Sequence, residues 1–353
     1  MTSRERIQLV LNHKEPDRVP IQDSPWSSAI HRWQREGLSP DISVAEYFDF
    51  EMVGIGADCS PRFPTEVLEK NEQFIISRSS TGAIDKNFRD HSTTPQLVDR
   101  PIKEKKDWLP IKKRLEPDYT RVNWISAFNT YQMARSEGKF IHYGGGWGYD
   151  ILQGYMRSDE LLMAMADDPD WVREMVMTLA ELNLEMMKMM MDKGIRFDGA
   201  FFYNDMGYRN GLLFSPDTYR RTQKEADAMV YAFCQKHNMP VILHSCGRVD
   251  ELIPDLIEIG LGCLQPLEVK AGMDLVELKH KYGDRLAFMG GIDVRAMADP
   301  NPEVIEHEIS TKLNVAKKNG GYIYHSDHSI PNNVSFQQFK RVIELVQKYG
   351  KYA

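Results

Sequence analysis

The chain has 353 residues, 42% of them hydrophobic and 27% charged, a composition typical of a soluble globular protein with a large core. Its formal net charge of −7 argues against nucleic-acid binding as the main task, because proteins with that task carry clustered positive charge. The sequence shows neither a hydrophobic signal region at its start nor a run long enough to span a membrane, so we expect a cytoplasmic protein without membrane contacts.

The first half of the chain has the less regular pattern. After a short N-terminal helix, residues 19–22 form the first predicted strand, and residues 51–57 are either the end of a helix or a second strand. The other expected elements are a hairpin of residues 74–79 and 82–88, a third strand at 140–143, and a helical stretch at 159–193 that breaks at Asp168-Pro169.

The second half alternates strands with helices in five successive units. Strands are predicted at 199–205, 240–243, 262–265, 286–290 and 322–324, and helices at 215–237, 249–259, 274–282, 302–319 and 335–349. Such a series implies parallel strands joined by right-handed crossovers. About eight parallel strands favour an α/β fold, a single (β/α)8 TIM barrel over residues 1–353 with an N-terminal helical and hairpin elaboration. An open doubly wound sheet is the alternative, although no Gly-x-Gly-x-x-Gly follows the first strand.

The most informative segment is 240–247, Pro-Val-Ile-Leu-His-Ser-Cys-Gly. Its apolar residues predict a buried strand, and His244 and Cys246 follow at the C-terminal end. Side chains two residues apart on an extended chain point the same way, so this imidazole and this thiolate can share one soft cation. Sulfur and nitrogen ligands suit zinc, and a catalytic zinc has three protein ligands. We expect His328 as the third ligand, with Asp205 and Glu268 as the next choices.

A metal-free alternative uses Cys246 as a nucleophile and His244 as its base, but neighbouring side chains on a strand seldom form such a hydrogen bond. A second alternative leaves Cys246 as a small buried apolar residue.

Other polar and aromatic side chains follow the remaining predicted strands. The carboxyl ends of parallel barrel strands meet around one mouth, so these side chains are expected to lie there. Asp205 and Glu268 are candidates to position or protonate a substrate, and Asp293 is the third candidate catalytic residue. Asp205 and Asp293 can alternatively cap the helices that follow them. The candidate substrate contacts are Asp23, Trp147, Tyr203 and Arg209.

Five stretches resemble the uroporphyrinogen decarboxylase superfamily, in order and over nearly the whole chain. They are residues 12–20, the region from the glycine-rich loop at 144–148 through 169, and residues 244–247, 290–293 and 328–335.

This superfamily contains two chemistries. True uroporphyrinogen decarboxylases carry Arg-Gln-Ala-Gly-Arg-Tyr after the first strand, where the arginines hold the carboxylates of the substrate. Here residues 22–29 read Gln-Asp-Ser-Pro-Trp-Ser-Ser-Ala, so the motif is absent. The other branch comprises zinc-dependent methyltransferases that act with corrinoid proteins and carry His-x-Cys at this strand end, as His244 and Cys246 do. The coenzyme M enzymes have a further cysteine after the last strand, where this chain has His328, which argues against coenzyme M as the acceptor.

The resemblance therefore implies a methyltransferase in which zinc activates the oxygen of a small substrate such as a methyl ether. The methyl group would move to the cobalt of cobalamin, a corrinoid. No Asp-x-His-x-x-Gly occurs in the chain, so a partner corrinoid protein must bring this cofactor unless it binds free. The loops at 144–149 and 206–213 would form the rim of a wide mouth, where Arg209 contacts the corrin or a substrate acid, unless it is a solvated loop residue.

Two other functions stay open. One is a cofactor-free decarboxylase in which Asp293 or Asp23 stabilises a cationic intermediate. The other is a non-catalytic barrel that binds a tetrapyrrole or a metal.

Overall fold

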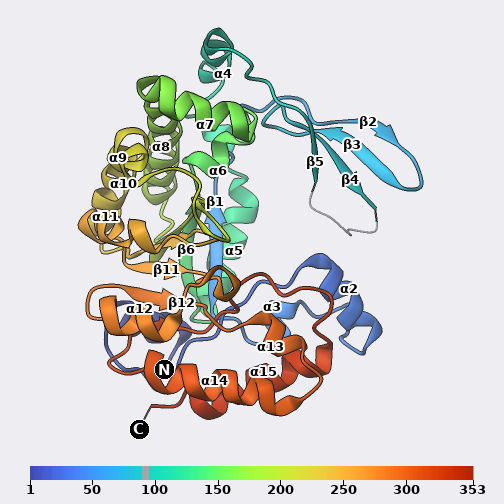
Figure 1. Cartoon of the computed structure of the whole chain (residues 1–353), viewed down its shortest axis with the longest axis vertical. Coiled ribbons are helices and arrows are strands. Elements are labelled where there is room, and N and C mark those ends of the chain that lie inside the picture. The colour runs from blue at the N-terminus through green and yellow to red at the C-terminus, as the bar shows by residue number, and fades with distance from the viewer. Residues whose placement is uncertain (90–94, 353) are drawn as a thin grey trace.

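A curled sheet of seven parallel strands forms the centre of the computed structural model, which describes residues 1–89 and 95–352 (Figure 1). The strands pair in the order β1-β6-β7-β10-β11-β12-β13. Their bounds are β1 (Met52–Gly56), β6 (Phe140–Gly145), β7 (Gly199–Tyr203), β10 (Val241–His244), β11 (Cys263–Gln265), β12 (Ala287–Met289) and β13 (Tyr322–Ile323). Residues 51–57 therefore contain a strand and not the end of a helix.

The segment around Ile21 closes this sheet into a barrel. Ile21 forms a parallel bridge with Tyr324. The amide of Gln22 donates to the carbonyl of Tyr324 at 3.1 Å, and the amide of Tyr324 donates to the carbonyl of Pro20 at 2.9 Å. On the other side, the amide of Glu51 donates to the carbonyl of Ile21 at 3.1 Å. The predicted first strand thus lies between β13 and β1 and takes the eighth position, as the (β/α)8 prediction requires.

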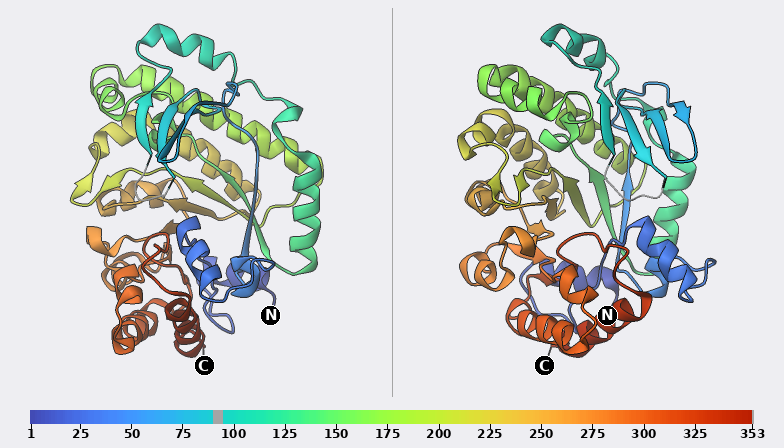
Figure 2. Two further views of the ribbon diagram at one scale, coloured as in Figure 1. Left: turned by 90° about the vertical axis from the view of Figure 1, so that its right-hand side faces the viewer. Right: turned by 45° about the vertical axis from the view of Figure 1, so that its right-hand side comes forward.

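Helices cover the outside of the barrel (Figures 1 and 2). The α-helices are α1 (Ser3–Leu11), α2 (Ser27–Arg35), α3 (Val44–Tyr47), α4 (Trp108–Lys112), α5 (Trp124–Ser136), α6 (Tyr149–Leu152), α7 (Ser158–Asp167), α8 (Pro169–Asp192), α9 (Pro216–Thr222), α10 (Lys224–Lys236), α11 (Ile253–Glu258), α12 (Leu275–Tyr282), α13 (Val294–Ala298), α14 (Pro302–Ala316) and α15 (Phe336–Tyr349). Four short 3₁₀ helices are η1 (Lys105–Asp107), η2 (Tyr119–Arg121), η3 (Asp250–Leu252) and η4 (Val269–Ala271). Among the described residues, none of these helices has both the length and the apolar character needed to cross a bilayer.

The predicted helix at 215–237 is in fact two helices, separated at Gln223. The backbone of Gln223 leaves the helical region, with φ at −132°. Its side-chain oxygen accepts hydrogen bonds from the amide of Tyr149 at 3.0 Å and from Nδ2 of Asn204 at 2.9 Å. These long-range bonds hold the residue out of the helix.

An antiparallel sheet projects from one side of the barrel and contains the predicted hairpin (Figure 2). Its side chains are at least partly exposed on every strand. The four strands are β2 (Glu66–Lys70), β3 (Phe74–Arg78), β4 (Ile84–Phe88) and β5 (Gln96–Asp99), and a separate two-stranded hairpin consists of β8 (Gly207–Tyr208) and β9 (Gly211–Leu212).

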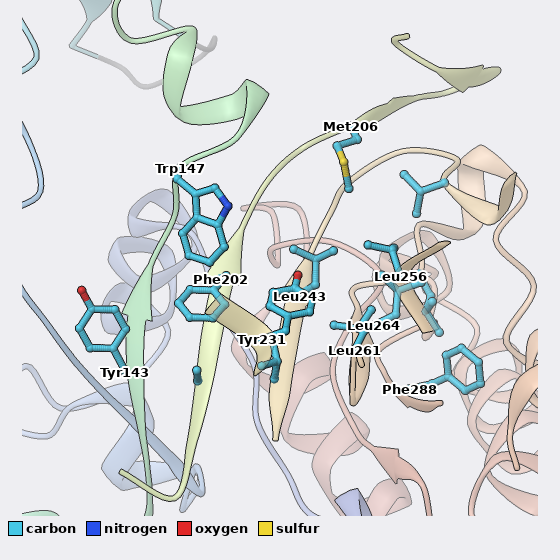
Figure 3. Close-up of a cluster of buried hydrophobic side chains, with 14 of the residues drawn as sticks. Tyr143, Trp147, Phe202, Met206, Tyr231, Leu243, Leu256, Leu261, Leu264 and Phe288 are labelled. Atoms are coloured by element: carbon cyan, nitrogen blue, oxygen red, sulfur yellow. The ribbon is translucent and has the colours of Figure 1, made fainter. Parts of the chain in front are cut away.

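Successive strand residues point to opposite faces, so the barrel has an inner and an outer apolar layer. Figure 3 shows the outer layer, where Phe202 lies 4.5 Å from Trp147 and stacks on Tyr231 at 6.3 Å, measured between ring centroids. The inner layer contains Phe201 and Ile242, and α1 packs its buried apolar side chains against it. Trp147 therefore belongs to the outer layer, on the far side of the sheet from the barrel interior.

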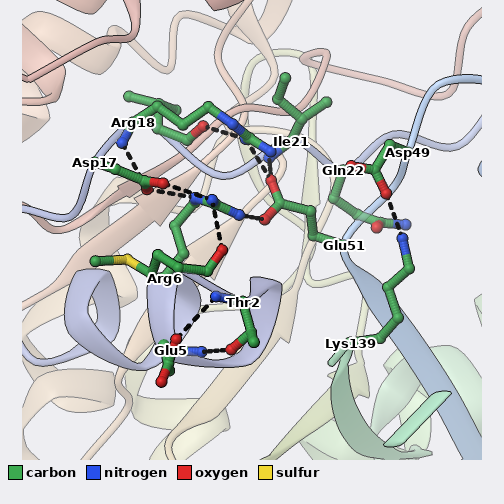
Figure 4. Close-up of polar contacts among 12 residues, drawn as sticks. Thr2, Glu5, Arg6, Asp17, Arg18, Ile21, Gln22, Asp49, Glu51 and Lys139 are labelled. Atoms are coloured by element: carbon green, nitrogen blue, oxygen red, sulfur yellow. Dashed lines mark hydrogen bonds and ion pairs between the residues drawn. The ribbon is translucent and has the colours of Figure 1, made fainter. Parts of the chain in front are cut away.

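A buried ion cluster joins α1, the closing segment and β1 (Figure 4). The carboxylate of Glu51 is fully buried and accepts hydrogen bonds from Arg6 at 2.5 Å, from Arg18 at 2.6 Å and from the amide of Ile21 at 2.7 Å. Arg6 also pairs with Asp17 at 2.7 Å. The donors come from α1 and from the closing segment, so Glu51 fixes the point at which the barrel closes.

Candidate active site

A small cavity opens at the carboxyl ends of the strands and has a volume of about 160 Å³. Its walls carry polar side chains, which are Gln22, Ser24, His142, Tyr203, His244, Gln265, His325 and Ser329. Its apolar part includes Met52, Phe201 and Met289. The strands of a barrel present alternate residues to the interior, which explains why inner-layer residues of β1, β6, β7, β10, β11 and β12 line it.

Three potential metal ligands converge beside this cavity. One ligand atom from each of Asp205, His244 and Cys246 lies within 4.8 Å of the others, and it is the one such group of three or more found among the described residues. Nε2 of His244 is 3.4 Å from Sγ of Cys246 and 3.4 Å from Oδ1 of Asp205. Two ligand atoms on a tetrahedral zinc are about 3.5 Å apart when the bonds measure roughly 2.0–2.3 Å. The donor atoms and the two separations from Nε2 of His244 therefore fit zinc.

The protonation of this group also suits a cation. Burial raises the pKa of the Cys246 thiol, and the carboxylates of Asp205 and Glu268 raise it further, so the thiolate needs a positive charge beside it. Burial opposes ionisation of Asp205, but its contact with the ring of His244 and the hydrogen bond that it accepts from the Cys246 amide at 2.8 Å outweigh this and lower its pKa. Burial raises the pKa of Asp150 to about 6, with repulsion from Asp205 as the second cause. The three potential ligands are therefore surrounded by acidic groups, a setting that favours a bound cation. The sequence alone did not indicate that Asp150 would lie near them.

Gln265 holds the imidazole of His244 in place. These two residues are register partners in β11 and β10. Nδ1 of His244 contacts Oε1 of Gln265, which can only accept, so Nδ1 carries the proton and Nε2 presents its lone pair to Asp205 and Cys246. Nε2 of Gln265 lies 3.4 Å from Nε2 of His325, whose Nδ1 donates to the carbonyl of Ser326 at 2.7 Å. Sequence reasoning missed Gln265, because its proximity follows from strand register.

Glu268 lies outside the ligand group and supports the loop that carries Cys246. Its Oε2 accepts from the amide of Gly247 at 2.7 Å, and its Oε1 pairs with Lys270 at 2.9 Å. Gly247 has φ at +78°, and a Cβ there would lie 2.3 Å from the backbone of Gly207. Glycine is therefore required at this turn, which presses against the β8–β9 hairpin.

The expected third ligand, His328, is also outside the group. Its ring packs edge-on against Trp26 with 5.5 Å between centroids, and its Nδ1 lies 3.2 Å from the carbonyl of Ser329. The structure thus brings the second choice, Asp205, to His244 and Cys246.

Three other predicted residues do not line the cavity. Asp293 caps α13 by accepting from the amide of Arg295 at 2.8 Å, which is the alternative considered for it. Asp23 is buried and accepts from the hydroxyl of Tyr324 at 2.9 Å. Trp147 donates Nε1–H to Asp227 at 2.7 Å in the outer layer.

Two predicted substrate contacts lie at the mouth or near its rim. Tyr203 lines the cavity, its ring is 4.9 Å from that of His244, and burial raises the pKa of its phenol. Arg209 is exposed in the turn between β8 and β9.

A family model described as "Uroporphyrinogen decarboxylase (URO-D)" matches residues 151–349, more than half of the chain. A protein of Vesicomyosocius okutanii subsp. Calyptogena okutanii (strain HA) described as "Uroporphyrinogen decarboxylase" is 29% identical over 79 residues. That match covers 22% of this chain and only 23% of the relative. Among solved structures, a methyltransferase from Methanosarcina mazei is similar with a TM-score of 0.66 and 15% identity, over 99% of each chain. At that identity the likeness establishes the shared fold.

Proposed function

The chain belongs to the uroporphyrinogen decarboxylase (URO-D) family, and we propose that it is a zinc-dependent methyltransferase that moves a methyl group between a small substrate and a corrinoid protein. The observation that carries this proposal is the convergence of Asp205, His244 and Cys246 beside the cavity. A decarboxylase that needs no cofactor has no use for a half-buried thiol beside two other potential metal ligands. The full-length structural similarity to a protein named a methyltransferase supports the same choice.

The chain's own residues have separate tasks in this proposal. Asp205, His244 and Cys246 would hold the zinc, which supplies a Lewis acid next to the cavity. Gln265 accepts from Nδ1 of His244, which leaves Nε2 of the neutral ring as the metal-binding nitrogen, and Glu268 orients the turn that presents Cys246. Tyr203 lines the cavity and retains its phenolic proton at neutral pH, so it can donate a hydrogen bond to the substrate oxygen that loses the methyl group.

The cavity itself weighs against a porphyrinogen substrate. Its volume of about 160 Å³ is smaller than the 300–1,000 Å³ of typical ligand sites, and no arginine or lysine lines it among the described residues. A tetrapyrrole with many carboxylates would have neither room nor cations there. A cobalamin would approach the mouth from outside, carried by its own protein.

Mixing the zinc-loaded protein with a reduced corrinoid protein and a methoxy compound tests the proposal. We expect the absorption spectrum of cobalt(I) to convert to that of methylcobalt(III), and the conversion to be lost in Cys246→Ser. Release of carbon dioxide from uroporphyrinogen, without any change at cobalt, would contradict the proposal.

A further inference from the structure

The cavity beside the three ligands indicates what kind of molecule it holds. We infer that the substrate is an uncharged compound with an apolar body about the size of a benzene ring and a hydrogen-bonding group. This inference deepens the proposed function and rests on it for the reaction, whereas the binding preference follows from the cavity alone.

The size limit follows from the volume. A cavity of about 150 Å³ lined by apolar side chains is known to hold one benzene molecule. The cavity here measures about 160 Å³, and Met52, Phe201 and Met289 give it an apolar surface. One ring or a short aliphatic chain therefore fills it.

The exclusion of charge follows from the lining. Among the described residues, no Asp, Glu, Lys or Arg lines the cavity. His142 does line it, but burial lowers the pKa of this histidine to about 4, so its ring is neutral at pH 7. A buried carboxylate or ammonium without an opposite charge is strongly disfavoured, so ionised molecules would be rejected.

Cations near the mouth do not offer an anion site inside the cavity either. Arg209 is exposed in the turn between β8 and β9 and does not belong to the cavity lining. Lys270 pairs with Glu268 at 2.9 Å, and Arg295 pairs with Asp293 at 2.7 Å. A zinc ion held by the carboxylate of Asp205 and the thiolate of Cys246 would have its two charges balanced. Nothing in this arrangement compensates a substrate carboxylate, sulfonate or phosphate.

Specific hydrogen-bonding groups remain for a neutral ligand. The side-chain oxygen of Gln22 accepts a hydrogen bond from the amide of Met52 at 3.0 Å. The Nε2 donor of Gln22 therefore faces other partners. Among residues 1–89 and 95–352, no protein acceptor for this donor is found. Nδ1 of His142 lies 3.4 Å from the carbonyl of Tyr143, so Nε2 of this ring is the acceptor.

Space for the ring of His142 depends on Gly54, its register partner in β1. A Cβ at Gly54 would lie 2.8 Å from Cε1 of the imidazole. The missing side chain therefore lets this imidazole occupy the cavity wall.

An isosteric set of probes tests the inference by calorimetry on the zinc-loaded protein without corrinoid. The probes are 4-methoxybenzyl alcohol, 4-methoxybenzoate and 4-methoxybenzylamine at pH 7. We expect the alcohol to bind at least tenfold more tightly than the anion and the cation. Equal or tighter binding of 4-methoxybenzoate, or no binding of the alcohol by folded protein, overturns the inference. Because no methyl transfer is involved, failure of the proposed reaction would leave this result standing.

A second test replaces the amide nitrogen of the Gln22 side chain with oxygen. Gln22→Glu keeps the oxygen that accepts from Met52 but replaces the amide donor with a carboxylate oxygen. We expect this variant to lose at least tenfold in affinity for the alcohol and to gain affinity for the amine. Gln73→Glu, at an exposed position in the turn between β2 and β3, is the matched control and should bind all three probes as the wild type does. Unchanged binding by folded Gln22→Glu would also overturn the inference.

Discussion

His244 donates its Nδ1 proton to the side-chain oxygen of Gln265, its neighbour in the adjacent parallel strand. This bond decides which nitrogen of the imidazole faces Asp205 and Cys246. The ligand geometry is therefore a property of two strands and their register, since neither residue alone fixes it.

Replacing Gln265 should weaken metal binding. In Gln265→Ala the Nδ1 proton of His244 loses its acceptor, and loss of such a supporting partner typically costs 10- to 100-fold in metal affinity. Competition with a zinc chelator would measure the change. Gln265→Glu retains an acceptor and should bind zinc within a few-fold of the wild type. Equal zinc affinity in wild type and folded Gln265→Ala would refute this role.

Two variants distinguish Asp205 from His328 as the third metal ligand. Asp205→Asn replaces a carboxylate oxygen in the ligand group and should lower zinc affinity at least tenfold, whereas His328→Asn should leave it unchanged because His328 packs on Trp26. The reverse result would identify His328 as the ligand, as the sequence alone suggested.

Asp227 should make the protein less stable as the pH rises from about 4 to about 6. Burial raises its pKa to about 6, against the bonds from Tyr219 and Trp147 that favour the ionised form. The folded state therefore binds a proton that the unfolded state has already released, and stability falls over this interval by up to about 3 kcal/mol. In Asp227→Asn this loss should be absent. Urea unfolding at pH 4 and pH 8 would compare the two, and a variant less stable than wild type at pH 8 would contradict the assignment.

The carboxylate of Glu51 should be essential for barrel closure. Glu51→Gln leaves the guanidinium groups of Arg6 and Arg18 without their buried counter-charge, and breaking a buried pair in this way costs about 3–5 kcal/mol. Glu69→Gln on the exposed strand β2 is the control and should change the free energy of unfolding by less than about 0.5 kcal/mol. Similar losses in both variants, measured by urea unfolding, would show that the cluster does not hold the barrel closed.

Much of the fold could be predicted because its signals are local. The apolar runs and helix ends of the second half gave the five strand–helix units, and the helix predicted from residue 215 does begin there, with Ser215 as the N-cap of α9. The break at Gln223 could not be predicted, because it depends on hydrogen bonds to Tyr149 and Asn204, which are distant in sequence.

Only the part of the candidate site that lies on one strand could be predicted from the sequence. The pair His244 and Cys246 follows from the two-residue period of a strand, which needs no knowledge of other strands. Asp150 and Gln265 reach the pair only through the loop after β6 and the register of β11. Trp147 was misplaced because the glycine-rich loop before it gives no sign of which face of the sheet its side chain takes.

The zinc content of the protein tests the central claim most directly. Wild-type protein, reconstituted with zinc and freed of excess metal, should contain one zinc per chain. Cys59→Ser, a matched change at a half-buried cysteine outside the ligand group, should contain the same amount, and Cys246→Ser should contain almost none. Equal zinc in wild type and folded Cys246→Ser would rule out the metal site.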